Sequence, residues 1–347
     1  MNRILHEDIK NFAKAFPLKE ELRGKTIMIT GATGLIGSCM VTCLQELNDQ
    51  QDLNMRIVAV VRNIDKATKL FGHNSNNILF YSYDFTSDLT FIPPCDVDYI
   101  IHLASITASR FFVENPVETI KTGIHSTETI LEYARKTVVK SVVYVSSLEV
   151  YGTILDDQKP ITEERQGYLN LMDSRSSYPM AKRASECLCH AYANEYNINV
   201  MTARLAQTFG AGVSLSDNRV FAQFAKNIIK KEDIILHTTG ELSRCYCYTT
   251  DAISGIFYIL LKGKAGEAYN IADEQSYISI ANMAKLLCSE FNPSAQVRIE
   301  PKEGMGYSPT TKLRLSSQKL RELGWQPRYH LKEMFRRLID SLKEENV

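Results

Sequence analysis

Residues 25–37 read KTIMITGATGLIG, and the fold of the chain follows from this stretch. An apolar run at 27–29 predicts a buried parallel strand, and an apolar, helix-forming segment comes after the turn. In that turn Gly31 suits a tight bend, Gly34 lets the backbone approach a phosphate, and Gly37 lets the helix pack closely on the strand. The helix dipole favours an anion at the same place. Although its spacing is G-x-x-G-x-x-G and not the commoner G-x-G-x-x-G, the stretch predicts a dinucleotide-binding unit.

Composition narrows the class of protein. The 347 residues include 40 Lys and Arg and 40 Asp and Glu, so no net charge favours nucleic acid or a membrane surface. The length suits roughly two domains with a proper core. No signal-peptide core and no apolar run of membrane-spanning length is present, so we expect a cytoplasmic protein. None of the eight cysteines forms C-x-x-C, and we expect free thiols and no metal site.

Strand and helix patterns alternate along the chain. Such alternation predicts a parallel, doubly wound sheet of the Rossmann-like α/β class with right-handed crossovers. After the first strand, the expected strands are 56–61, 76–82, 98–103, 141–146 and 199–204, and the expected long helices are 117–136 and 177–196.

The pattern divides the chain into three parts. We expect an N-terminal helical extension (1–23), a Rossmann domain (24–205) and a smaller mixed α/β lobe (206–347) that interleaves with it and binds the substrate. Residues 1–16 have the pattern of an amphipathic helix that packs on the fold. We expect the C-terminal residues 341–347 to be frayed.

Polar side chains follow several of the predicted strands. Asp84, His102–Ser105, Ser146, Ser147 and Glu149 lie at or just beyond strand ends. Because the carboxyl ends of parallel strands meet at one edge, we expect these residues to converge on one crevice. His102 follows a buried strand, which favours a packed, hydrogen-bonded histidine over a catalyst.

Tyr178 and Lys182 are four residues apart on a predicted helix, so the phenol and the ammonium share one face. A nearby ammonium favours the phenolate, and we expect the pKa of Tyr178 to be lowered toward a useful range. Ser147 is placed to hydrogen-bond the same substrate hydroxyl. Tyr-x-x-x-Lys is a weak pattern alone, but it becomes specific after a glycine-rich turn and an SS-x-x-VYG segment.

With these motifs in order, the chain resembles the extended short-chain dehydrogenases/reductases, the nucleotide-sugar epimerase/dehydratase family. The segments that carry the resemblance are GATGLIG, HLAS, VSSLEVYG, SYPMAK and RLAQTFG. The resemblance implies that Ser147, Tyr178 and Lys182 form the catalytic triad, that Asp84 binds the adenine edge, and that a homodimer forms through helices 117–136 and 177–196. The implied NAD(P)-binding residues are Gly31, Thr33, Gly34, Leu35, Ile36, Gly37, Arg62, Asp84, Phe85, Leu103, Ala104, Ser105, Tyr178 and Lys182.

Within that family, the chain is most similar to UDP-glucuronate decarboxylases. SSLEVYG resembles their TSEVYG, which makes Glu149 the active-site glutamate. The implied reaction is redox-neutral: C4 loses a hydride to the bound nicotinamide, the resulting 4-keto sugar has an acidified C5 and loses its C6 carboxylate as carbon dioxide, and the retained cofactor returns the hydride to C4. The implied contacts to a nucleotide-diphosphate sugar, UDP-linked by this resemblance, come from Ser147, Arg175, Gln207, Arg219 and Arg244.

Departures from that pattern leave other functions open. Arg62 replaces the acidic residue of NAD-binding members, so with Lys66 it is placed to meet the 2′-phosphate of NADP, or it is simply a solvated loop residue. Gln207 replaces an asparagine, and ITASR at 106–110 replaces a proline-rich loop over the sugar. Leu148 stands where 4,6-dehydratases carry Asp. The alternatives are a 4-epimerase, an NADPH-dependent 4-keto-sugar reductase, or a non-catalytic NAD(P)H-binding scaffold.

Overall fold

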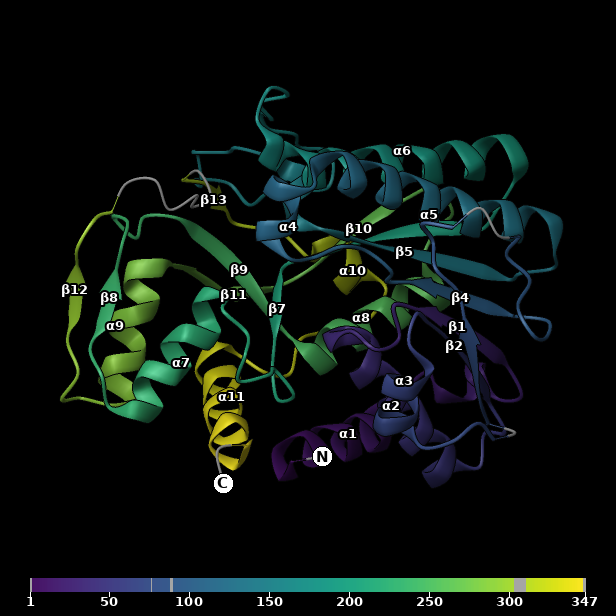
Figure 1. The fold of residues 1–347 in the computed structure, drawn as a ribbon, viewed down its shortest axis with the longest axis horizontal. Coiled ribbons are helices and arrows are strands. Elements are labelled where there is room, and N and C mark those ends of the chain that lie inside the picture. The colour runs from purple at the N-terminus through teal and green to yellow at the C-terminus, as the bar shows by residue number, and fades with distance from the viewer. Residues whose placement is uncertain (1, 76, 88–89, 303–309, 346–347) are drawn as a thin grey trace.

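A seven-stranded parallel sheet forms the centre of the computed structural model, which describes residues 2–75, 77–87, 90–302 and 310–345 (Figure 1). The strand order is β10-β6-β5-β4-β1-β2-β3. The strands are β1 (Thr26–Thr30), β2 (Arg56–Val61), β3 (Ile78–Ser82), β4 (Tyr99–His102), β5 (Ser141–Ser147), β6 (Val200–Leu205) and β10 (Ala268–Ile271). The chain runs from β1 outward to β3, returns to the other side of β1 at β4, and continues outward. The predicted Rossmann-like, doubly wound fold is therefore confirmed.

The strand predictions hold to within two residues for each of the five later strands. The third was expected to begin at Asn76, which lies outside the described residues.

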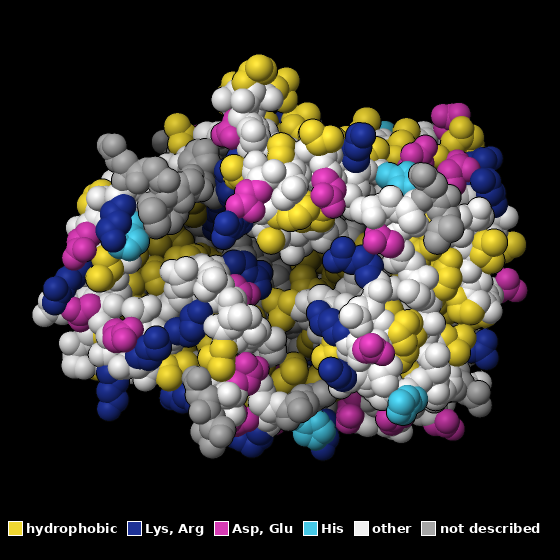
Figure 2. Space-filling view, in the orientation of Figure 1, with side chains coloured by type: hydrophobic (Ala, Val, Ile, Leu, Met, Phe, Trp, Pro, Cys, Tyr) yellow, Lys and Arg dark blue, Asp and Glu magenta, His cyan; other side chains and the backbone are white. Residues whose placement is uncertain are grey.

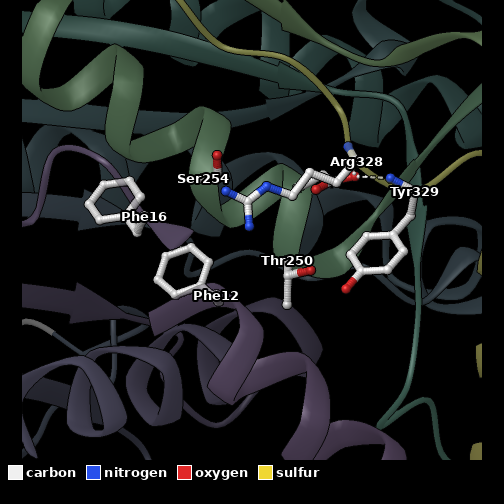
Figure 3. Close-up of a pocket in the computed structure, with 7 residues that line it drawn as sticks. Phe12, Phe16, Thr250, Ser254, Arg328 and Tyr329 are labelled. Atoms are coloured by element: carbon white, nitrogen blue, oxygen red, sulfur yellow. Dashed lines mark hydrogen bonds between the residues drawn. The ribbon is translucent and has the colours of Figure 1, made fainter. Parts of the chain in front are cut away.

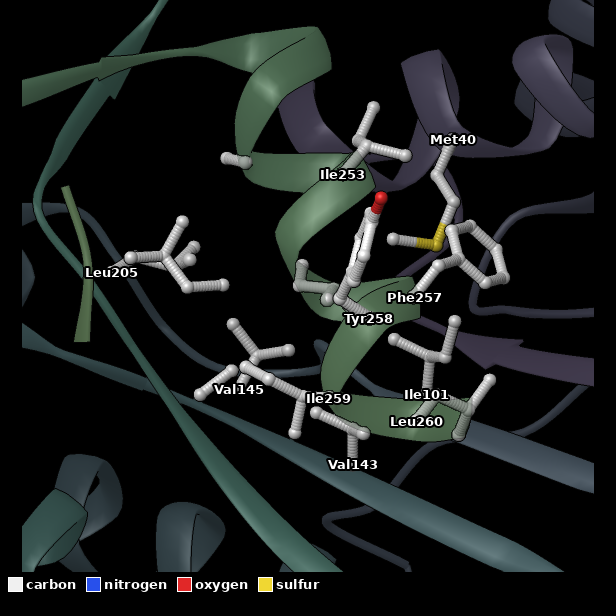
Figure 4. Packing of buried hydrophobic residues seen from close by; sticks show 14 of the residues in the cluster. Met40, Ile101, Val143, Val145, Leu205, Ile253, Phe257, Tyr258, Ile259 and Leu260 are labelled. Carbon is white, nitrogen blue, oxygen red and sulfur yellow. The ribbon is translucent and has the colours of Figure 1, made fainter. Parts of the chain in front are cut away.

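Helices cover both faces of this sheet, which explains why its strands are apolar on both sides. On β1, Ile27 and Ile29 face a core shared with α2 and α8, whereas Met28 faces a second core shared with α5 and α6. Figure 4 shows the first of these cores, with Met40 and residues of α8 packed on the sheet. The helices of this part are α1 (Arg3–Ala15), α2 (Leu35–Gln51), α3 (Ile64–Phe71), α4 (Ser109–Glu114), α5 (Pro116–Lys136), α6 (Ser177–Tyr196) and α8 (Thr249–Lys262), with 3-10 turns η1 (Lys19–Leu22), η2 (Leu148–Tyr151) and η3 (Ser174–Ser176).

A smaller lobe packs beside the sheet (Figure 1). Its strands form the order β11-β9-β13, with β7 also paired to β9, and a separate pair β12-β8. The elements are β7 (Gln207–Phe209), β8 (Ile234–Leu236), β9 (Ser243–Tyr248), β11 (Asp273–Ser279), β12 (Val297–Ile299), β13 (Lys312–Leu313), α7 (Val220–Lys230), α9 (Ile280–Phe291) and α11 (Leu331–Glu345). The short helix α10 (Gln318–Glu322) instead packs on the central sheet, against β10 and α8.

Strand β9 joins the two parts because its two faces belong to different cores. Cys245 and Cys247 face the core under α8, while Tyr246 and Tyr248 face the core of the lobe. Both tyrosines are buried, so they are core residues of the lobe. The eight cysteines are free thiols.

The two ends of the chain lie side by side (Figure 1). The predicted N-terminal amphipathic helix is present as α1, and Asn2 Nδ2 donates to Ser341 Oγ at 2.8 Å. The expectation of a frayed C-terminus is wrong for residues 341–345, because α11 continues to Glu345 with Ser341 and Leu342 fully buried against its neighbours. Residues 346–347 lie outside the described part. No helix of the described residues is long and apolar enough to cross a membrane.

Candidate active site

The site forms where the strand order reverses, between β1 and β4. Thr30 and His102 are paired at the carboxyl ends of these strands. Gly31 follows with a φ of +66°, and a Cβ added to it would lie 3.0 Å from the Ala104 nitrogen. The turn after β1 therefore touches the turn after β4. In doubly wound sheets this crevice is where ligands bind.

The glycine-rich turn forms an open cradle at the start of α2. A Cβ on Gly37 would lie 2.3 Å from the Gly31 carbonyl oxygen, so only glycine lets the helix pack this closely. Gly34 is exposed and caps α2 without a side-chain hydrogen bond. Thr33, Leu35 and Ile36 are half-buried around it. Backbone amides of the first helical turn are thus available to an anion, and the cradle fits a dinucleotide pyrophosphate.

Further predicted cofactor residues lie on the neighbouring strand ends. Arg62 and Asp84 are exposed just beyond β2 and β3. The backbone and hydroxyl of Thr86 hydrogen-bond Asp84 and, with the charge of Arg62, lower the pKa of the Asp84 carboxyl despite some opposing desolvation. The charges of Arg62 and Asp84 therefore attract each other at the edge of the cradle. Phe85 is buried against the His102 ring, while Leu103 and Ser105 are half-buried.

The expected catalytic groups converge on Tyr178. Ser147, at the end of β5, hydrogen-bonds the Tyr178 phenol, and Glu149 in η2 lies close enough to act on its charge. The pKa of Tyr178 is raised, chiefly by burial and then by Glu149, against the lowering effect of Ser147. The expectation that Lys182 lowers this pKa is therefore wrong for the described structure. The phenol is largely buried, and the Lys182 ammonium is directed at the Val145 carbonyl oxygen.

Lys182 lies one helical turn beyond Tyr178, as the spacing predicts. Its Nζ donates to the Val145 carbonyl oxygen at 2.8 Å and lies 4.8 Å from the centre of the Tyr144 ring, but 5.8 Å from that of the Tyr178 ring. Burial lowers the pKa of Lys182 to about 8. The ammonium is consequently held near the end of β5, and it releases its proton more readily than an exposed lysine does.

His102 is a packed residue, as predicted. It is buried, and burial followed by the charge of Lys182 lowers its pKa to about 3, so the ring is neutral. Its Nδ1 lies 2.7 Å from Thr30 Oγ1, which also accepts from the Ala104 amide at 3.0 Å. A neutral His102 thus ties the turn after β1 to the turn after β4. The sequence analysis did not identify Thr30, although its position directly before Gly31, the first glycine of the motif, could have indicated it.

Sequence reasoning did not find Phe112. Its ring stacks on Tyr178 with centroids 4.3 Å apart and planes within 5°. Phe112 lies on α4, and its carbonyl oxygen accepts from Ser177 Oγ at 3.1 Å, which fixes α4 against α6. No spacing rule links α4 to α6, so only the folded chain identifies this wall of the site.

Of the other expected substrate residues, Gln207, Arg219 and Arg244 lie in the lobe, and Arg175 lies ahead of α6. Gln207 begins β7, which pairs with β9, and Arg244 lies on β9 with its Nε buried and without a hydrogen-bond partner among the described residues. Arg219 is exposed at the start of α7 and ion-paired with Asp217 at 2.5 Å. Arg175 is half-buried in η3, ahead of helix α6.

The surface between the two parts of the molecule is hollowed, and Lys and Arg side chains gather around the hollow (Figure 2). Cationic groups at such a site favour a diphosphate ligand.

Fold and site together define a dinucleotide-dependent enzyme of the Rossmann class. Residues 27–272 match the model of the NAD dependent epimerase/dehydratase family, so the chain belongs to that family. It is 28% identical to UDP-glucuronic acid decarboxylase 1 of Xenopus tropicalis, over 98% of this chain and 79% of that protein. It is also 28% identical to UDP-glucuronic acid decarboxylase 5 of Arabidopsis thaliana, over 88% of this chain and 86% of that one.

Solved structures share the fold. An epimerase from Methanothermobacter thermautotrophicus superposes with a TM-score of 0.77 at 21% identity, covering 95% of this chain and 97% of the other. A dTDP-glucose 4,6-dehydratase from Streptomyces venezuelae superposes with a TM-score of 0.74 at 22% identity, covering 92% and 98%.

Proposed function

We propose that this chain modifies a nucleotide-diphosphate sugar through a transient 4-keto sugar, in a reaction like that of UDP-glucuronate decarboxylases, with NAD as the bound cofactor. The observation that carries the proposal is the convergence of Ser147, Glu149 and Tyr178 beside the glycine cradle. The curated relatives named as UDP-glucuronic acid decarboxylases support it.

The cradle after β1 would hold the cofactor. Gly31, Gly34 and the first turn of α2 would bind the pyrophosphate, and Asp84 the adenine edge. Lys182, held near the end of β5, would reach the nicotinamide ribose. When bound, nicotinamide supplies a reversible hydride acceptor, which makes a redox-neutral reaction at C4 feasible.

The protein groups then handle protons. Tyr178 is the base for the C4 hydroxyl proton, and Ser147 hydrogen-bonds the phenol and favours its ionised form. Burial and Glu149 raise the pKa of Tyr178, so its phenolate, once formed, is a stronger base for that hydroxyl proton. Glu149 would act at C5, either as acid/base or by orienting the sugar. Leu148 is buried in the core, so that position supplies no acid for dehydration at C6.

One observation favours a second function. Arg62 is exposed at the cradle edge, and Lys66 is exposed one helical turn further, in α3. A 2′-phosphate would suit these two cations, and a preference for NADPH would fit a 4-keto-sugar reductase. We therefore expect Arg62→Asp to shift any NADP preference toward NAD by at least tenfold in the ratio of dissociation constants.

The first test identifies the nucleotide that remains bound to the purified protein, by denaturation and mass spectrometry. Retained NAD(H) would support the redox-neutral reaction, and an empty site that prefers NADPH would support the reductase.

The second test incubates the protein with UDP-glucuronate and follows loss of carbon dioxide from the sugar by mass spectrometry. Tyr178→Phe should lower the rate by roughly 10²–10⁴-fold. Tyr196→Phe, at the exposed end of the same helix, is the matched control and should retain the rate. Equal function in Tyr178→Phe and the wild type would instead support a non-catalytic NAD(P)H-binding scaffold.

A further inference from the structure

Helix α1 precedes the part of the chain that matches the family model, yet it contacts both halves of the molecule. On one side Phe12 and Phe16 pack against α8 and the segment at Arg328 and Tyr329 (Figure 3). The cavity between them, about 10 Å³, is the size of a single water and suits no larger ligand. The apolar face of α1 therefore anchors it to the fold.

The polar side of α1 places a carboxylate inside the lobe. Asp8 is 2% exposed, and its two oxygens accept from Arg337 Nε at 2.6 Å and from the Tyr248 hydroxyl at 2.5 Å. Burial raises the pKa of Asp8 to about 6, against the lowering effects of Tyr248 and Arg337. At neutral pH the Asp8 carboxylate is therefore ionised and accepts a hydrogen bond from the Tyr248 hydroxyl.

Tyr248 connects Asp8 to the loop after β7. With its proton directed at Asp8, its oxygen accepts from the Ala211 amide at 3.2 Å. The ring also fills the space beside Gly210, where an added Cβ would lie 2.8 Å from Tyr248 Cε2. Tyr248 thus holds the backbone of residues 210–211 by both its hydroxyl and its ring.

Two further contacts from α1 and α11 hold the next residue of this loop. Gly212 has a φ of +88°, and a Cβ on it would lie 3.2 Å from Leu5 of α1. Its amide donates to Ser341 Oγ at 3.3 Å, and the same oxygen accepts from Asn2, the N-cap of α1, at 2.8 Å. The start of α1 and the start of the loop therefore share one anchor.

We propose that α1 is a positioning element for the nucleotide-sugar-binding loop at 210–219, acting through Asp8 and Tyr248. The proposal rests on the proposed function, since that loop joins Gln207 of β7 to Arg219 at the start of α7. Among the described residues, the hydrogen bonds and ion pairs of Asp8 and Tyr248 involve neither the cofactor cradle nor Tyr178, so they are positioning residues. Their loss should weaken binding of the nucleotide diphosphate and leave dinucleotide binding unchanged.

The experiment titrates UDP into full-length protein saturated with NAD, by calorimetry, and repeats the titration of NAD alone. Tyr248→Phe removes the hydroxyl and keeps the ring, and Asp8→Asn removes the charge. We expect each to raise the UDP dissociation constant at least fivefold and to leave that of NAD within twofold. The KM for the sugar nucleotide should rise with little change in kcat. Lys10→Gln, at an exposed position of the same helix, is the matched control and should leave both dissociation constants unchanged.

The outcomes separate the two proposals. If the wild type binds NAD but none of UDP, dTDP, CDP, GDP or ADP, the proposed function fails and the positioning role fails with it. If the wild type binds one of these nucleotides and the dissociation constant of Tyr248→Phe for it lies within twofold of the wild-type value, the positioning role alone is overturned. Should Tyr248→Phe not fold, Ser341→Ala takes its place, because it removes the hydroxyl that accepts from the Gly212 amide and from Asn2. It should raise the dissociation constant of the nucleotide at least fivefold, and a value within twofold of the wild type would overturn the positioning role.

Discussion

Replacing Lys182 with methionine should stabilise the folded protein at neutral pH while abolishing activity. Burial lowers the pKa of this ammonium from its ordinary 10.5 to about 8. That difference corresponds to roughly 3 kcal/mol by which the charged side chain opposes folding. Methionine has a similar length and no charge, but it leaves the Val145 carbonyl oxygen without its 2.8 Å donor, at roughly 1 kcal/mol. The net expectation is a gain of about 2 kcal/mol.

The pH dependence of this gain follows from the direction of the shift. The folded-state pKa of Lys182 lies below the unfolded one. Below a pH of about 8, the charged Lys182 therefore lowers the free energy of unfolding of the wild type by the full amount. Between about pH 8 and 10.5 the folded chain has released the proton and the unfolded chain still holds it, so wild-type stability recovers. The advantage of Lys182→Met should therefore shrink as pH rises through this window.

The assay is urea unfolding of the wild type and Lys182→Met between about pH 7 and pH 10, compared as differences so that other titrating groups cancel. Lys121→Met, on the exposed side of α5, is the control and should show a small, pH-independent difference. The reasoning would be refuted if Lys182→Met were less stable than the wild type at neutral pH, or if their difference stayed constant across the range.

Three further predictions concern the cradle, a buried ion pair and assembly. Gly37→Ala places a methyl group 2.3 Å from the Gly31 carbonyl oxygen, so it should cost about 1–3 kcal/mol and weaken NAD binding; unchanged melting and NAD titration would contradict this. Glu186→Gln leaves Arg204, whose side chain is 12% exposed, without its carboxylate, and should cost about 3–5 kcal/mol by urea unfolding, whereas Glu20→Gln at an exposed pair should change little. Helices α5 and α6 should pair across a two-fold axis, and a monomeric mass by light scattering at micromolar concentration would rule that dimer out.

Local sequence was sufficient for the glycine-rich cradle and for the shared face of Tyr178 and Lys182. Gly31, Gly34 and Gly37 lie at a turn whose backbone geometry depends on residues within one strand–turn–helix unit, and Tyr178 and Lys182 share a face because of helical periodicity alone. These features depend on interactions over a few residues. The same reasoning located the first six strands of the central sheet to within two residues, because an apolar run buried on both faces marks a parallel strand.

Only the tertiary structure decided how the site is enclosed and charged. The direction of the Tyr178 pKa shift depends on burial and on Glu149, which opposed the local expectation from Lys182. The stacking of Phe112 on Tyr178 joins segments about sixty residues apart, and the contact between Asp8 and Tyr248 spans 240 residues. Desolvation and such contacts are set by which distant segments exclude water from a group, and no local pattern of residues specifies that.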